Sequence, residues 1–288
     1  MVMNRICTMF FSPTGHTRKT VMGLAKKLSV LLKIDDVEHR DFTLPAERVR
    51  VPKYGEGDLL ILGVPVIAGR VPNVLLPFLR ELQGSGALGV PVVVYGNRNF
   101  DDALVELQDL MEDAGITTIS GGAFVGEHSF SYSLGKNRPD ESDMDILDKW
   151  AESLADRIRN GEPFLTVELP GVRPYRPYYV PRDRDGNSVD IRKVKPKTSD
   201  ACINCKLCVK ACPMGAIDYH NVRNYHNICI KCNACVKKCP VDAKYFDDAD
   251  YIYHKEELEA MYGDLHRSPV FFVESGTNFS PQQPEYTK

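Results

Sequence analysis

"ACINCKLCVKACPMG" (201–215) is the stretch that decides how part of this chain folds, and "ICIKCNACVKKCPVD" (228–242) repeats it. Each run has the spacing C-x2-C-x2-C-x3-C and is followed by proline. Three thiols at intervals of three residues can surround one side of a compact inorganic cluster, while the turn before the proline directs the fourth thiol elsewhere. We therefore expect this region to fold around metal, without a large apolar core.

Two kinds of metal site suit eight closely spaced thiolates, namely iron–sulfur clusters and structural zinc. Zinc ribbons generally use two separated C-x2-C pairs, whereas each run here holds four cysteines and ends in Cys-Pro. The spacing therefore favours iron–sulfur clusters. Cys7 lies apart from both runs, inside an apolar segment, and is interpreted as a small buried hydrophobe.

Residues 199–248 resemble the bacterial ferredoxins that carry two [4Fe–4S] clusters, and every ligand position of that motif is filled. In that family the fourth cysteine of each run binds the other cluster. The resemblance implies one cluster on Cys202, Cys205, Cys208 and Cys239, and a second cluster on Cys229, Cys232, Cys235 and Cys212.

Short apolar runs alternate with segments of helical period from residue 5 to about 160, as in a parallel sheet covered on both faces. Strands are predicted at 5–11, 37–41, 58–65, 90–96 and 117–124. Helical periodicity is present at 21–32, 103–111 and 146–158, and the last helix ends at Asn160-Gly161. The pattern predicts an α/β domain with a doubly wound, parallel, five-stranded sheet.

"FFSPTGHTRKT" (10–20) connects the first predicted strand to the first helix. Ser12, Thr14 and Thr17 supply hydroxyl groups, Gly15 allows close backbone approach, and the helix start supplies free N–H groups. The loop matches neither the dinucleotide nor the nucleoside-triphosphate motif. It predicts a site for a terminal phosphate, with structural helix capping by Ser and Thr as the alternative.

The same loop resembles the phosphate loop of flavodoxins, which bind FMN, and the resemblance extends over about residues 4–160. It implies that two further strand-end loops hold the flavin ring. The candidate FMN contacts are Ser12, Thr14, Gly15, His16 and Thr17, then Pro65, Val66, Ile67, Ala68 and Gly69, then Gly96, Asn97, Arg98, Asn99 and Phe100. Neither ring loop contains Trp, so Phe100 or Tyr95 is the candidate for stacking on the ring.

Composition divides the chain into a flavodoxin-like domain (1–165), a basic, proline-rich linker (166–198), a ferredoxin-like α+β domain (199–248) and a tail (249–288). Residues 173–198 hold eight Lys or Arg against three Asp, which gives +5. The linker is either a solvated, semi-stiff connector or a basic docking strip for an acidic redox partner.

The two domains together resemble a family of flavodoxin–ferredoxin fusions. The resemblance implies an electron-transfer protein that relays electrons between two [4Fe–4S] clusters and FMN in anaerobic metabolism, with a redox protein as partner. A second hypothesis is an FMN-dependent reductase acting directly on a small organic substrate, with His128 or Arg98 as proton or charge donor. A third is a non-redox module with structural metal.

The bulk composition excludes several partners. A net charge of −3 does not favour nucleic acid. No apolar run approaches the roughly 18 residues of a membrane span, and none resembles a signal peptide, so we expect a cytoplasmic protein. Thiols stay reduced in that compartment, which again favours metal over disulfides. The sequence leaves open whether the chain forms a homo-oligomer.

Overall fold

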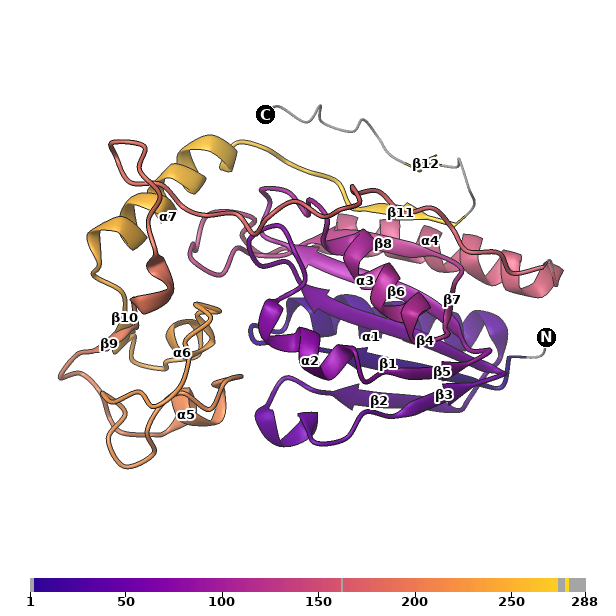
Figure 1. The fold of residues 1–288 in the computed structure, drawn as a ribbon, viewed down its shortest axis with the longest axis horizontal. Helices are drawn as coiled ribbons and strands as arrows, with labels where there is room; N and C mark the ends of the chain where they lie inside the picture. The colour runs from indigo at the N-terminus through magenta and orange to yellow at the C-terminus, as the bar shows by residue number, and fades with distance from the viewer. Residues whose placement is uncertain (1–2, 162, 274–277, 280–288) are drawn as a thin grey trace.

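The computed structural model describes residues 3–161, 163–273 and 278–279 (Figure 1). A larger unit of helices and strands holds the first half of the chain, and a smaller cysteine-rich unit lies beside it (Figure 1). The parallel strands of the larger unit run toward the smaller one, so that their carboxyl ends face it (Figure 1). The strand-end loops are thereby placed next to the cysteine runs.

Five parallel strands form the body of the sheet, in the order β8-β6-β4-β1-β2. Their bounds are β1 (Arg5–Phe10), β2 (Val37–Asp41), β4 (Asp58–Pro65), β6 (Leu88–Tyr95) and β8 (Gly121–Val125). Counted along the chain, this order is 5-4-3-1-2, the flavodoxin-type arrangement of a doubly wound sheet. The predicted fold class is confirmed. The predicted strand 117–124 is divided into β7 (Thr117–Thr118), which pairs with β6, and β8.

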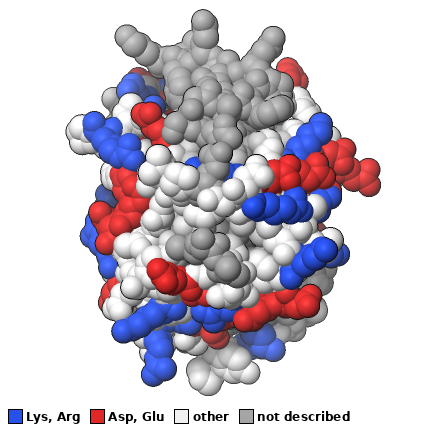
Figure 2. All heavy atoms as spheres, turned by 90° about the vertical axis from the view of Figure 1, so that its right-hand side faces the viewer, with Lys and Arg blue, Asp and Glu red and all other residues white. Residues whose placement is uncertain are grey.

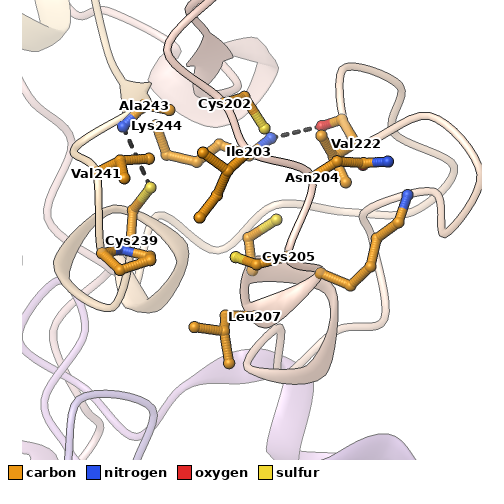
Figure 3. A pocket seen from close by; sticks show the side chains of 13 residues that line it. Cys202, Ile203, Asn204, Cys205, Leu207, Val222, Cys239, Val241, Ala243 and Lys244 are labelled. Atoms are coloured by element: carbon orange, nitrogen blue, oxygen red, sulfur yellow. Dashed lines mark hydrogen bonds between the residues drawn. The ribbon is translucent and has the colours of Figure 1, made fainter.

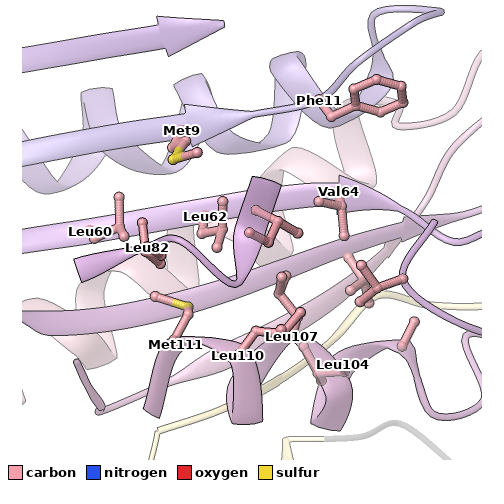
Figure 4. Packing of buried hydrophobic residues seen from close by; sticks show 14 of the residues in the cluster. Met9, Phe11, Leu60, Leu62, Val64, Leu82, Leu104, Leu107, Leu110 and Met111 are labelled. Atoms are coloured by element: carbon pink, nitrogen blue, oxygen red, sulfur yellow. The ribbon is translucent and has the colours of Figure 1, made fainter. Parts of the chain in front are cut away.

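Helices cover both faces of the sheet. α1 (His16–Leu32) and α4 (Glu141–Asn160) lie on one face, while α3 (Ala103–Asp113) and the short α2 (Leu76–Leu79) lie on the other. Successive residues of a strand point to opposite faces. In β1, for example, Met9 packs in the α3 layer and Phe10 in the α1 layer. Figure 4 shows the α3 layer, where Leu104, Leu107 and Met111 meet Leu60 and Leu62.

The tail extends the sheet, which the five-strand prediction did not include. After α7 (Ala249–Tyr262), strand β11 (Val270–Phe272) pairs antiparallel with β8, and β12 (Asn278–Phe279) pairs with β11. Trp150 Nε1 donates to Ser120 Oγ at 2.7 Å, and that hydroxyl donates to the carbonyl oxygen of Phe272 at 2.6 Å. The tail therefore covers an edge of β8 that would otherwise expose unpaired backbone groups. A separate parallel pair consists of β3 (Lys53–Gly55) and β5 (Gln83–Ser85).

The first half of the linker packs against the larger unit. Arg173 pairs with Asp109 of α3, and Arg176 pairs with Asp102. Tyr178 Oη donates to the carbonyl oxygen of Val71 at 2.8 Å. This part of the linker is therefore not a solvated connector, and these two arginines do not form a docking strip, because acidic residues of α3 and its start already neutralise them.

The cysteine-rich unit is small and internally repeated. It contains α5 (Leu207–Lys210), α6 (Ala234–Lys237) and an antiparallel pair of β9 (Lys197–Thr198) with β10 (Lys244–Tyr245). Short 3₁₀ turns occupy Pro45–Arg48, Asn73–Leu75 and Ile191–Lys193 elsewhere in the chain. Within the described residues, no helix has both the length and the apolar character needed to cross a bilayer. Figure 2 shows Lys and Arg interspersed with Asp and Glu on the face turned away from this unit.

Candidate functional site

The first predicted set of cysteines surrounds one pocket. Cys202, Cys205, Cys208 and Cys239 all line it, and Cys212 does not. Figure 3 shows the sulfurs of Cys202, Cys205 and Cys239 around a shared space, with Ile203 and Leu207 beside them. Three ligands from one run and the fourth from the other therefore meet at a single place.

The four cysteines line a common space and do not converge on one point. Among the residues that the structure describes, no three Cys, His, Asp or Glu side chains converge to hold one metal ion. A tetrahedral zinc site requires four ligands about one point, each at about 2.0–2.3 Å from the metal. The four cysteines instead surround a space, as a cluster bound at its corners requires. The donor set therefore fits an iron–sulfur cluster.

The second predicted set is also gathered, around Cys212. Burial, together with the neighbouring Cys229 and Cys212, raises the pKa of the Cys232 thiol to about 12. Burial raises the pKa of Cys235 as well, with contributions from Cys232, Cys229 and Cys212. A bound metal deprotonates a coordinating thiol outright. These mutual effects show that Cys212 of the first run lies close to the cysteines of the second run.

The backbone repeats itself around the two sets. Asn204 and Lys206 have φ of 56° and 62°, and their counterparts Lys231 and Asn233 have φ of 54° and 55°. Side chains other than Asn and Gly seldom adopt this left-handed conformation, which tightens the chain around each set. In both halves the last cysteine accepts a backbone hydrogen bond, from Ala216 to Cys212 Sγ (3.2 Å) and from Ala243 to Cys239 Sγ (3.1 Å). Such bonds to sulfur tune a cluster's potential.

Lys244 and Tyr225 lie between the two sets, and sequence reasoning did not single them out. Lys244 lines the first pocket, is 3% exposed, and its Nζ donates to Tyr225 Oη at 3.0 Å. Burial raises the pKa of Tyr225, and the charges of Cys235 and Cys229 raise it further. Nothing in the spacing of the cysteines could have revealed this buried pair.

The predicted phosphate loop presents free backbone donors. Gly15, with φ of 100°, begins α1, and Ser12 Oγ accepts a hydrogen bond from the backbone N–H of Arg18 at 2.9 Å. Ser12 therefore does cap the helix. The backbone N–H groups of Thr14, Gly15, His16 and Thr17, in contrast, donate to no described residue. Four unpartnered N–H groups at the start of a 17-residue helix suit an anionic phosphate.

The loops that follow the other strands meet the phosphate loop at the same edge. A Cβ at Gly126 would lie 3.0 Å from His16 Cβ, and one at Gly96 would lie 2.2 Å from His128 Cδ2. At both positions only glycine leaves room for the neighbouring loop. The structure therefore brings together the loops after β1, β6 and β8.

Linker and tail add aromatic rings to the loops after β4 and β6. The backbone N–H of Tyr179 donates to the carbonyl oxygen of Ala68 at 2.9 Å, and the Arg98 guanidinium lies 5.0 Å from the Tyr179 ring centroid. His254 of α7 stacks on Tyr179 at 5.7 Å. Sequence reasoning missed both rings, because neither lies near a strand end. The two candidates for stacking on the flavin ring, Phe100 and Tyr95, lie side by side with their ring centroids 5.5 Å apart.

Asn97 offers an unused polar atom inside the candidate FMN site. Its side chain is 2% exposed, and its Nδ2 donates to the carbonyl oxygens of Tyr262 (2.9 Å) and Leu265 (2.7 Å). Its Oδ1 is buried, and no described residue donates to it. Buried polar atoms normally have a partner. The pyrimidine ring of a flavin carries an N–H donor that would provide one, so the loop fits FMN.

The two candidate proton donors are otherwise engaged. His128 Nδ1 accepts a hydrogen bond from the backbone N–H of Phe130 at 3.1 Å. Burial, together with the nearby charges of His254, Lys237 and Arg98, lowers the pKa of His128 to about 3, so the imidazole is neutral at pH 7. Arg98 pairs with Asp101. Neither side chain is placed as a free acid.

Direct bonds join the cysteine-rich unit to the strand-end loops. Lys237 of α6 pairs with Glu127, and its Nζ donates to the carbonyl oxygens of His128 (2.8 Å) and Ser131 (2.7 Å). Arg48 donates to the carbonyl oxygen of Pro213 at 2.6 Å. The second cysteine set, which contains Cys212, therefore belongs to the side that contacts the sheet.

In the comparison with known families, residues 201–244 match the model of a 4Fe-4S dicluster domain. The smaller unit is thus similar to 4Fe-4S dicluster domains. The chain is similar to NADH-quinone oxidoreductase subunit I 1 of Rhodopseudomonas palustris (strain BisA53), at 41% identity over 73 residues. That match covers 24% of this chain, and the chain spans 37% of the length of that relative.

Solved structures similar to the larger unit include the rubredoxin oxygen:oxidoreductase of Desulfovibrio gigas (15% identity, 55% of this chain and 37% of that chain, TM-score 0.40). A flavodoxin from the domain Archaea is also similar, with 14% identity over 54% of this chain and 99% of that chain and a TM-score of 0.39. So is a Fusobacterium nucleatum flavodoxin bound to flavin mononucleotide, with 17% identity over 55% of this chain and 99% of that chain and a TM-score of 0.34. The fold assignment rests on the strand order described above. The chain joins a flavodoxin-like domain to a dicluster domain, which confirms the expected fusion and indicates a redox function.

Proposed function

We propose that this chain binds FMN at the carboxyl edge of its sheet and two [4Fe–4S] clusters in its dicluster domain, and that it relays electrons between them. The observation that carries the proposal is the contact of Lys237 with Glu127, His128 and Ser131. This contact fixes the second cysteine run against the loop after β8. In that loop Gly126 lies against His16, and His128 lies against Gly96. The two candidate cofactor sites therefore adjoin each other.

Each part of the chain has a defined role in this proposal. Cys202, Cys205, Cys208 and Cys239 would hold one cluster, and Cys229, Cys232, Cys235 and Cys212 the other. The N–H groups of residues 14–17 would bind the FMN phosphate, and the loops at 65–69 and 96–100 would hold the ring. When bound, FMN exchanges electrons singly or in pairs, whereas each cluster exchanges one. Covalent linkage keeps the sites together, so that exchange does not await diffusion.

The alternative of a reductase acting directly on a small substrate finds no support at its two candidate residues. His128 is neutral and uses Nδ1 as an acceptor, and Arg98 is paired with Asp101. The tail also covers Asn97 at the end of β6. We therefore favour a partner protein over a small molecule as the outside source or acceptor of electrons.

Anaerobic purification followed by metal, sulfide and flavin analysis tests the proposal. We expect about eight iron and about eight sulfide per chain, with a flavin spectrum on a broad iron–sulfur shoulder. Dithionite should bleach both features. A colourless protein, or one that carries zinc, would contradict the proposal.

A further inference from the structure

The two halves of the dicluster domain are equivalent in sequence but differ in their surroundings. Cys202 corresponds to Cys229, so Ile203 corresponds to Ile230 and Lys210 to Lys237. Ile230 packs against the core of the sheet unit, whereas Ile203 is 63% exposed. At this pair of positions the second half therefore packs on the sheet unit, whereas the first half leaves its isoleucine exposed.

The same contrast holds at the other equivalent positions. Ala234 is fully buried, whereas its counterpart Leu207 is 43% exposed. Lys237 pairs with Glu127 and two carbonyl oxygens, whereas Lys210 is exposed, and no described residue bonds to its Nζ. The first half thus presents an isoleucine, a leucine and a lysine at the positions where the second half holds its docking contacts.

These exposed residues lie at a cofactor site. Ile203 and Leu207 line the pocket of Cys202, Cys205, Cys208 and Cys239 (Figure 3). Lys210 ends α5, which begins at Leu207. Exposed apolar groups around such a site mark a contact surface when they are rimmed by polar residues. Here the polar residues beside Ile203 and Leu207 are Asn204, Lys206 and Lys210.

The charge at this surface indicates the kind of partner. Two carboxylates close to this surface are already engaged, since Asp200 pairs with Arg223 and Asp218 with His226. Lys206 and Lys210 pair with no carboxylate among the described residues. A partner with acidic groups around an apolar contact would complement this arrangement.

We propose that Ile203, Leu207 and Lys210 form the docking surface for an external, acidic electron-transfer protein. The proposal rests on the proposed function. The partner places apolar side chains on Ile203 and Leu207 and a carboxylate on Lys210, as Glu127 does for Lys237 inside the chain. One electron moves between the two proteins at each encounter, so one is oxidised as the other is reduced, and no proton or bond changes.

The experiment measures binding of an oxidised, acidic two-[4Fe–4S] ferredoxin as the probe, by calorimetric titration against the fully loaded protein. Lys210→Glu and Ile203→Glu are compared with Val30→Glu, which adds a charge at a 70% exposed position on α1. We expect binding that weakens with salt, and a loss of affinity of about tenfold or more in the first two variants only. Equal affinities for Lys210→Glu and Val30→Glu overturn the proposal.

Two controls distinguish a failure of the docking surface from a failure of the proposed function. Dithionite should bleach the wild type and every variant equally, and a wild type without bleachable flavin and clusters contradicts the proposed function itself. If dithionite acts normally while all variants bind the probe alike, only the docking surface is wrong. The alternative occupant of this surface is a second copy of the chain, and sedimentation of the wild type and of Ile203→Glu tests it. A wild-type dimer that Ile203→Glu dissociates would overturn the proposal.

Discussion

Lys237 and Glu127 form an ion pair that joins the second cysteine run to the loop after β8. Their side chains are only 10% and 17% exposed, and two backbone carbonyls complete the bonding of the lysine. Lys210, at the equivalent place in the first run, has no such contact among the described residues. The two lysines therefore provide a matched pair for testing the junction.

Lys237→Met should weaken the junction, because it leaves a largely buried carboxylate without its counter-charge. We expect the free energy of unfolding to fall by about 2–4 kcal/mol and electron exchange between clusters and flavin to slow. Denaturant unfolding and laser-flash reduction measure the two effects. Lys210→Met should change neither quantity, and similar behaviour of the two variants would show that the contact is unimportant.

Cys212→Ser should disturb the cluster held by Cys229, Cys232 and Cys235, although Cys212 is closer in sequence to the first run. Cys239→Ser should disturb the other cluster, since Cys239 lines the pocket of Cys202, Cys205 and Cys208. EPR of the reduced proteins distinguishes the two. If each substitution affected the cluster of its own run, the crossed ligation would be incorrect.

Gly15→Ala should weaken FMN binding by about tenfold, because a left-handed conformation costs a residue with a Cβ about 1–2 kcal/mol. Gly15 has φ of 100°, and no atom lies within 4 Å of the added Cβ, so the effect comes from the backbone alone. Fluorescence titration of the flavin-free protein measures the affinity. Riboflavin, which lacks the phosphate, should bind the wild type and the variant alike. An equal loss for both ligands would place the phosphate elsewhere.

Acid should destabilise the protein through His128. Its pKa is lowered from 6.5 to about 3 in the folded state, so the unfolded chain takes up the proton first as pH falls. The contribution of His128 to stability is thus complete above about pH 6.5 and is lost progressively toward about pH 3. Urea unfolding between pH 7 and pH 5 should show a shallower decline for His128→Asn, which keeps an acceptor for the Phe130 N–H but does not titrate. Identical slopes would exclude this role.

Much of the fold could be predicted because local pattern and tertiary environment agree. β2 and β4 coincide with the predicted 37–41 and 58–65. For β4 the reason is its unbroken apolar run "DLLILGVP", which is buried on both faces of a parallel sheet. The resemblance to two-cluster ferredoxins implied that Cys239 joins the first run, and Cys239 does line that pocket. For β4, a short stretch of sequence contains the whole physical cause.

The tail was not predicted in detail, because its structure depends on distant partners. β11 has three residues, and its pairing is set by the open edge of β8. α7 did carry a signal, since Tyr251, His254 and Leu258 are buried at helical spacing. Lys237 could not be distinguished from Lys210 by sequence, because both precede the last cysteine of their runs, and only docking on the sheet makes them different.

Laser-flash reduction of the fully loaded protein at several protein concentrations tests the central claim most directly. The flash reduces the clusters, and the absorbance of the flavin is then followed. If the clusters and FMN of one chain exchange electrons, flavin reduction should proceed at a rate that does not depend on protein concentration. A rate that rises in proportion to concentration, or clusters that stay reduced beside oxidised flavin, would contradict it.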